Sequence, residues 1–305
     1  MDLFVDILTR VTLPIIALAA LGYLCQPWLK LDIATLTRLQ VNIVMPAFLV
    51  HYLSAGKQPL DVVALVATLA VIQFMILIPL GWLLVIMLRL RGSLGPIMGL
   101  GTAYANVGFF GIPVTQLAFG AEYLLHQSVL TAMMTILVCT LGVWLLSPSA
   151  GGFTRKLRSA FETPLIPSVA LGLGLRYFEV ELPPIASQPL QLLGAIFTPL
   201  ALYTLGAQIA AAKSLRLELM PQTIILVLKL MLSPLITLYL CRLMDVPADV
   251  TAVMVVAAAT PVGVLITIFA AELKAEPEFI STATVITTAL SPLTVTAWII
   301  ASRLW

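Results

Sequence analysis

Long apolar stretches alternate along this chain with short segments that hold charges, prolines and glycines. A helix needs about 20 mostly apolar residues to cross a bilayer, and the stretches lack the period-2 alternation of membrane β-strands. The pattern therefore predicts an all-α polytopic membrane protein with ten transmembrane helices. The predicted spans are 3–25, 32–54, 61–90, 95–118, 122–146, 163–178, 184–212, 221–243, 247–271 and 277–302.

The composition supports a membrane protein and excludes several other classes. Hydrophobic residues make up 61% of the 305 residues and charged residues only 10%, whereas soluble domains have about 45–50% and about 25%. A soluble enzyme is therefore excluded. The net charge of +2 is too small for a nucleic-acid partner. The three cysteines, Cys25, Cys139 and Cys241, are too widely spaced for a disulfide framework or a metal site, and we expect neither metal nor cofactor.

The lysines and arginines predict the orientation in the bilayer. Asp2 and Asp6 precede Arg10, so the first apolar run reads as a membrane span and not as a signal peptide. Positive residues gather in cytoplasmic loops, and an outside N-terminus gives nine in those loops against four outside. The nine are Lys30, Arg89, Arg91, Arg155, Lys156, Arg158, Lys213, Arg216 and Lys274, and the four are Lys57, Arg176, Arg242 and Arg303. We therefore expect a multi-pass inner (plasma) membrane protein with both termini extracytoplasmic.

The two halves of the chain repeat the same landmark residues in the same order. The matched pairs lie 153 to 155 positions apart and are Pro14 and Pro167, Pro46 and Pro199, Pro79 and Pro234, Gly108 and Gly263, and Trp144 and Trp298. They predict a first repeat over 1–146, a cytoplasmic loop over 147–162 and a second repeat over 163–305. Because each repeat has an odd number of spans, the second must be inverted, as in many transporters. The alternative is a duplication kept only for packing.

The fourth and ninth spans contain residues that interrupt helices. Glycine and proline weaken a helix interior, and irregular backbone survives in a membrane only where protein or a watery cavity satisfies it. Each break creates a half-helix N-terminus that attracts anions, and an asparagine amide adds a donor. The candidate substrate-binding residues are Asn106, Val107, Gly108, Gly111, Thr260, Pro261, Val262 and Gly263. The alternative is a pair of simple proline kinks.

Asn106-Val-Gly-Phe-Phe-Gly111-Ile-Pro113 resembles the signature of the auxin efflux carrier family, which includes the plant PIN auxin exporters. The resemblance extends to Thr260–Gly263, to Pro199–Gln208 and to Lys229 ahead of Pro234, and it covers essentially the whole chain. The long cytoplasmic loop of the large plant members is absent, so the chain resembles a compact bacterial-type member. The plant motif has proline before the asparagine, where this sequence has Ala105.

The resemblance implies a specific architecture and mechanism. Spans 1, 2, 6 and 7 would form a scaffold, with a homodimer interface through spans 2 and 7. Spans 3–5 and 8–10 would form a mobile transport domain in which broken helices 4 and 9 cross. Such a protein would move its substrate by an elevator mechanism. Bacterial relatives are associated with malonate, malate and similar acids, which agrees with an anion site at the breaks.

Lys229 is the one ionisable residue near the centre of a span, and no Asp or Glu falls there. Ionisable residues inside a membrane usually serve function. Lys229 could neutralise a substrate carboxylate, or it could stand where sodium binds in related symporters, or it could tie broken-helix carbonyls together. Gln73 is its approximate repeat mate, and Thr131 and Thr135 are further candidates to line a substrate site.

These features favour a secondary carrier of small organic anions, either dicarboxylates or auxin-like carboxylates. The alternatives are a sodium-coupled symporter of the bile-acid-symporter type and an anion channel. A channel needs a continuous polar stripe, whereas the polar residues here gather around the two breaks. An enzyme is not expected, because neither His51 nor His126 lies in a catalytic or metal-binding motif.

Overall fold

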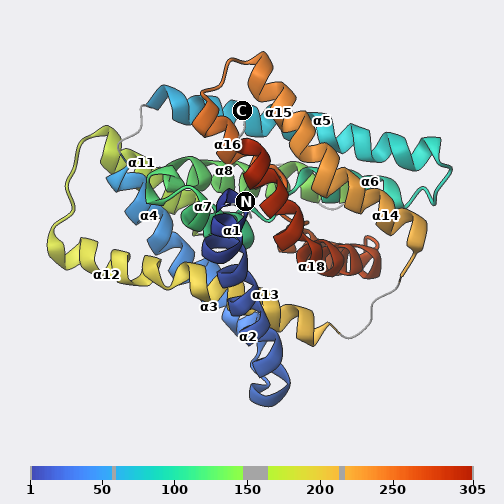
Figure 1. The fold of residues 1–305 in the computed structure, drawn as a ribbon, viewed down its shortest axis with the longest axis horizontal. Helices are drawn as coiled ribbons and strands as arrows, with labels where there is room; N and C mark the ends of the chain where they lie inside the picture. The colour runs from blue at the N-terminus through green and yellow to red at the C-terminus, as the bar shows by residue number, and fades with distance from the viewer. Residues whose placement is uncertain (1, 57–59, 147–163, 213–216, 304–305) are drawn as a thin grey trace.

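The computed structural model describes residues 2–56, 60–146, 164–212 and 217–303, and these residues are almost entirely helical (Figure 1). No strand occurs in the described ranges, which confirms the all-α class. The basic loop expected over 147–162 lies outside them. The helices are α1 (Asp2–Ile7), α2 (Leu13–Leu29), α3 (Ile33–Leu39), α4 (Met45–Ala55), α5 (Leu60–Met87), α6 (Leu94–Ala103), α7 (Ile112–Ala118), α8 (Leu124–Leu137), α9 (Val143–Leu146), α11 (Leu165–Tyr177), α12 (Pro184–Ala195), α13 (Phe197–Ala211), α14 (Leu219–Val227), α15 (Ser233–Leu243), α16 (Ala248–Ala258), α17 (Val264–Leu273) and α18 (Pro277–Ser302).

The lengths of these helices match the apolar runs of the sequence. Within the described residues, seven continuous helices of 23 to 28 residues are long and apolar enough to cross a membrane, and five apolar helices are shorter. The sixth run forms the short helix α11, and the fourth and ninth runs are each split into two short helices. The multi-pass membrane class is therefore supported, whereas ten crossings in two inverted repeats stay a prediction.

Prolines explain why several long helices are irregular. Wide π-helical turns, η1 (Leu8–Thr12), η2 (Gln40–Val44), η3 (Val107–Gly111) and η6 (Leu228–Leu232), each end two residues before a proline. A proline has no N–H group, and its ring crowds the carbonyl four residues earlier. Widening the preceding turn relieves that crowding, so the helix continues through each of these prolines.

The helices pack in two groups that the figure separates. In Figure 1, α2, α3, α12 and α13 lie in the lower part of the view, and α5, α6, α14 and α15 lie in the upper part. Helix α13 packs along α2, and α4 packs against both α11 and α12. Helix α5 packs along α6 and α8, and α15 packs along α16.

Two glycines let α2 and α13 approach closely. A Cβ on Gly22 would overlap the carbonyl of Tyr203, and a Cβ on Gly206 would overlap the carbonyl of Ala19. Lipid tails are as apolar as side chains, so membrane helices associate through close packing of small residues. The α2–α13 pair is therefore a tightly fixed unit of the fold.

Candidate functional site: two crossed helix breaks

Both helix interruptions expected from the sequence are present, and they meet each other. The first lies between α6 and η3, where Tyr104 has extended backbone angles, and the second lies between α16 and α17. The N–H of Asn106 donates to the carbonyl of Pro261 at 2.8 Å, and the N–H of Gly263 donates to the carbonyl of Tyr104 at 3.1 Å. The two breaks thus run antiparallel, with Ala105 opposite Val262.

Side chains from neighbouring helices satisfy further backbone groups at the breaks. Gln127 of α8 donates to the carbonyl of Val107 at 2.6 Å, and Thr131 donates to the same oxygen at 3.3 Å. At the second break, the N–H of Val262 donates to the hydroxyl of Thr287 on α18 at 3.2 Å. Buried backbone groups need such partners, so α8 and α18 hold the breaks in place.

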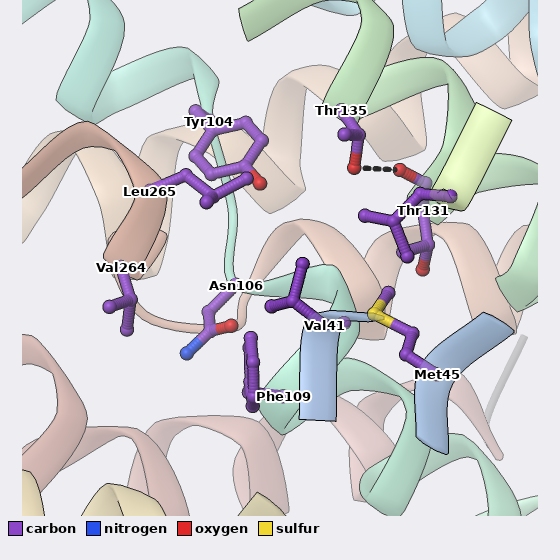
Figure 2. A pocket seen from close by; sticks show the side chains of 11 residues that line it. Val41, Met45, Tyr104, Asn106, Phe109, Thr131, Thr135, Val264 and Leu265 are labelled. Carbon is purple, nitrogen blue, oxygen red and sulfur yellow. Dashed lines mark hydrogen bonds between the residues drawn. The ribbon is translucent and has the colours of Figure 1, made fainter. Parts of the chain in front are cut away.

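A small cavity of about 20 Å³ lies beside the crossing (Figure 2). It is lined by Val41, Met45, Tyr104, Asn106, Gly108, Phe109, Thr131, Thr135, Leu165, Val264 and Leu265. Gly108 and Phe109 belong to the first turn after one break, and Val264 and Leu265 begin the helix after the other. The N–H groups of a first helical turn have no partner within their own helix. Two helix N-termini therefore converge on one cavity.

Asn106 is the polar side chain that stands out at this cavity. It is 3% exposed, and its amide nitrogen Nδ2 is buried without a hydrogen-bond partner among the residues that the structure describes. Figure 2 shows the amide between Val264 and Phe109. A buried donor without a partner is costly, and the partial positive charge of two helix ends surrounds it. The arrangement suits an anionic oxygen, which would accept hydrogen bonds from the amide and from the free backbone N–H groups.

The cavity is too small for an organic acid as it stands. A volume of about 20 Å³ has room for about one water molecule. Val41 and Met45 of the α3–α4 segment and Leu165 of α11 close one side of it. A larger ligand requires these side chains to separate from the breaks.

Lys229 lies at a different part of the second break. Its side chain is fully buried, and its Nζ donates to the carbonyl of Ala258 at 3.0 Å, at the C-terminal end of α16. Ser233 donates to the same carbonyl at 3.4 Å, and Gln73 donates to the Ser233 hydroxyl at 3.5 Å. The Lys229 Nζ therefore supplies a donor to a carbonyl at a helix C-terminus, and neither Lys229 nor Gln73 lines the cavity.

The other predicted residues make local contacts close to the breaks. The hydroxyl of Thr260 donates to the carbonyl of Ala257 at 2.7 Å, and that of Thr135 donates to the carbonyl of Thr131 at 2.7 Å. A Cβ on Gly111 would stand 2.5 Å from Nε2 of Gln127. Glycine at 111 therefore leaves room for the amide that holds the first break.

Sequence reasoning missed most of the apolar lining of the cavity, and it also missed Gln127, Thr287 and Tyr104, which bond or line the breaks. Gln127 lies one helical turn before Thr131, so its place on the same face of an apolar helix was a usable signal. Thr287 could not be singled out because its segment contains many threonines. Tyr104 lies two residues before Asn106, and no sequence pattern distinguishes it. Their roles depend on tertiary contacts that the sequence does not reveal.

Comparison with known proteins identifies the family of this chain. A model of the family described as "Membrane transport protein" matches residues 7–299. A protein of Methanothermobacter thermautotrophicus described as an uncharacterized transporter is 27% identical over 297 residues, which cover 95% of this chain and 97% of that protein. The resemblance inferred from the motifs around Asn106 and Pro261 is thereby confirmed, and the chain belongs to the auxin efflux carrier family of membrane transport proteins.

Proposed function

We propose that this protein is a secondary active transporter of small organic anions, either dicarboxylates of the malonate and malate type or auxin-like carboxylates. The substrate carboxylate binds between the two breaks. The observation that carries the proposal is the unpartnered amide of Asn106, buried beside two helix N-termini. A carboxylate there receives charge-assisted hydrogen bonds, which are stronger than neutral ones.

The helices are proposed to make ten crossings in two inverted five-helix repeats. The packing supports this arrangement. Helix α2 of the first repeat packs on α13 of the second, and α11 of the second packs on α4 of the first. In span numbers, span 1 packs on span 7, and span 6 packs on span 2. Because span 6 is the repeat mate of span 1 and span 7 that of span 2, the two contacts are equivalent under exchange of the repeats. The antiparallel pairing of the breaks is also what two oppositely inserted repeats would give.

Transport is proposed to follow an elevator motion of spans 3–5 and 8–10 against a scaffold of spans 1, 2, 6 and 7. The cavity supports this division, because Val41, Met45 and Leu165 come from the scaffold and its other lining residues come from the moving group. A motion between the groups would open the cavity to a substrate. The homodimer through spans 2 and 7 is part of the same proposal, and exposed apolar residues such as Leu39 and Leu192 give those spans an outer face to bury.

Paired cysteines test the elevator motion. Thr198 on α13 donates to Gln116 on α7 at 2.6 Å across the proposed boundary, whereas Gln40 donates to Thr204 at 2.5 Å within the scaffold. Each pair is replaced by two cysteines and joined by a reducible bifunctional thiol reagent. Crosslinking 116 to 198 is expected to stop transport until reduction, and crosslinking 40 to 204 to leave it intact. Full transport with both links in place would contradict the motion.

The substrate class is tested by ligand-dependent stability of the purified protein. Malonate, malate, succinate and indole-3-acetate are screened by thermal shift with and without sodium, because a ligand that binds only the native state raises its stability. Saturable stabilisation by one acid class would identify the substrate group. Saturable uptake of the same acid into proteoliposomes distinguishes a carrier from an anion channel. The proposal would be refuted if none of the carboxylates raised the melting temperature and none was taken up into proteoliposomes.

A further inference from the structure

A second, larger cavity adjoins the cavity at the crossed breaks. It has a volume of about 570 Å³ and lies between α3 and α13 on one side and α17 and α18 on the other. Its walls include Arg38, Gln208, Val264, Thr267, Glu272 and Thr284. Val264 also lines the small cavity at the breaks. We call the larger cavity the vestibule, because it adjoins the small cavity at this shared side chain.

One face of a single helical segment connects the two spaces. Thr37 and Arg38 of α3 line the vestibule, and Val41 and Met45, one and two turns further on, line the small cavity. Residues three and four positions apart share a helix face. A molecule that moves along this face passes Arg38 immediately before it reaches the breaks.

The charges of the vestibule are ordered along its length. Among the described residues that line it, Arg38 is the one cation and Glu272 the one acid. Arg38 is three residues from Val41, a rise of about 4.5 Å, whereas Glu272 is eight residues from Val264, a rise of about 12 Å. Arg38 therefore lies nearer the breaks. Its side chain is exposed and forms no ion pair with any residue that the structure describes.

We propose that the vestibule is an anion-binding antechamber in which Arg38 holds the substrate carboxylate before it enters the site at the breaks. The inference rests on the proposed function. A guanidinium binds a carboxylate through two parallel hydrogen bonds, and a positive charge inside a cleft raises the local concentration of anions. Two further cations stand at nearby helix ends. Lys30 is the C-cap residue of α2, shortly before α3 begins, and Lys274 is the C-cap residue of α17.

The test measures the charge preference of the vestibule and needs no knowledge of the substrate. Thr284→Cys is labelled in the purified protein with a negatively charged sulfonatoethyl methanethiosulfonate and with its positively charged trimethylammonium analogue. The wild-type protein, with its three native cysteines, supplies the background rate. We expect the anionic reagent to react faster. Replacing Arg38 by Gln should lower the ratio of the two rate constants by roughly tenfold, and Arg38→Lys should preserve it.

Two control variants keep the result interpretable. Arg10 is an exposed arginine that forms an ion pair with Asp6 at 2.6 Å and does not line the vestibule. Arg10→Gln should therefore leave the ratio unchanged. Glu272→Gln should raise the ratio, which gives a second reading if Arg38→Gln fails to fold. An unchanged ratio in both Arg38→Gln and Glu272→Gln, or a cysteine at 284 that reacts with neither reagent, would overturn the antechamber. The labelling rates do not involve Asn106, so this failure is distinguishable from failure of the proposed function.

Discussion

Replacing Asn106 by alanine is expected to weaken anion binding without weakening the fold. The backbone N–H of Asn106 still donates to Pro261, and its carbonyl still accepts from Phe110 and Gly111, because the substitution leaves these bonds in place. The side-chain amide Nδ2 has no hydrogen-bond partner within the described part of the chain. An unsatisfied buried donor costs about 1–3 kcal/mol, so its removal offsets the packing lost with the side chain.

The bound state is affected in the opposite direction. A hydrogen bond to a charged group contributes roughly 1.5–3 kcal/mol, and about 1.4 kcal/mol corresponds to a tenfold change in affinity. The dissociation constant of Asn106→Ala for the substrate anion should therefore rise roughly 10- to 100-fold. Isothermal titration calorimetry measures this change, and the melting temperature without ligand reports the fold.

A matched asparagine supplies the control for this experiment. Asn42 is exposed and does not line the cavity, and its amide donates to the carbonyl of Arg38 at a distance of 2.8 Å. Asn42→Ala should bind the anion as the wild-type protein does. An Asn106→Ala protein that melts at a much lower temperature but binds with unchanged affinity would refute the reasoning, because the amide would then be structural.

Three further outcomes follow from contacts at the breaks. Uptake into proteoliposomes should persist when sodium is replaced by potassium or choline, because the Lys229 Nζ already donates to the Ala258 carbonyl at the helix end. Transport that collapses without sodium would contradict this. Gly263→Ala should abolish transport and lower the melting temperature, since a Cβ there would overlap the Tyr104 ring; a variant with normal uptake would show that the crossing tolerates displacement. Gln127→Leu should destabilise the protein by about 1–3 kcal/mol, measured by chemical denaturation, because it removes the 2.6 Å hydrogen bond to a carbonyl at the first break; unchanged stability would mean that another group replaces the amide.

The sequence predicted the helices and the positions of their interruptions because both depend on local chemistry. Apolar runs define the spans, and the glycines and prolines near Asn106 and Pro261 mark where regular hydrogen bonding fails. The pairing of the two breaks and the Gln127 contact could not be predicted, because residues distant in the chain create them. For Lys229, the sequence left three roles open, and the contact with Ala258 is the one expected if it ties broken-helix carbonyls together.

The crossing of the breaks also has a consequence for how sequences can vary within the family. The pairing uses the N–H of Asn106 and the carbonyl of Tyr104, and no hydrogen bond from the N–H of Ala105 is present among the described residues. Tyr104 already has the extended angles, φ −89° and ψ 107°, that a residue before proline prefers. The crossing therefore needs no backbone N–H at position 105 and places little requirement on the side chain there. Both alanine, as in this chain, and proline, as in the plant motif, are compatible with this backbone crossing.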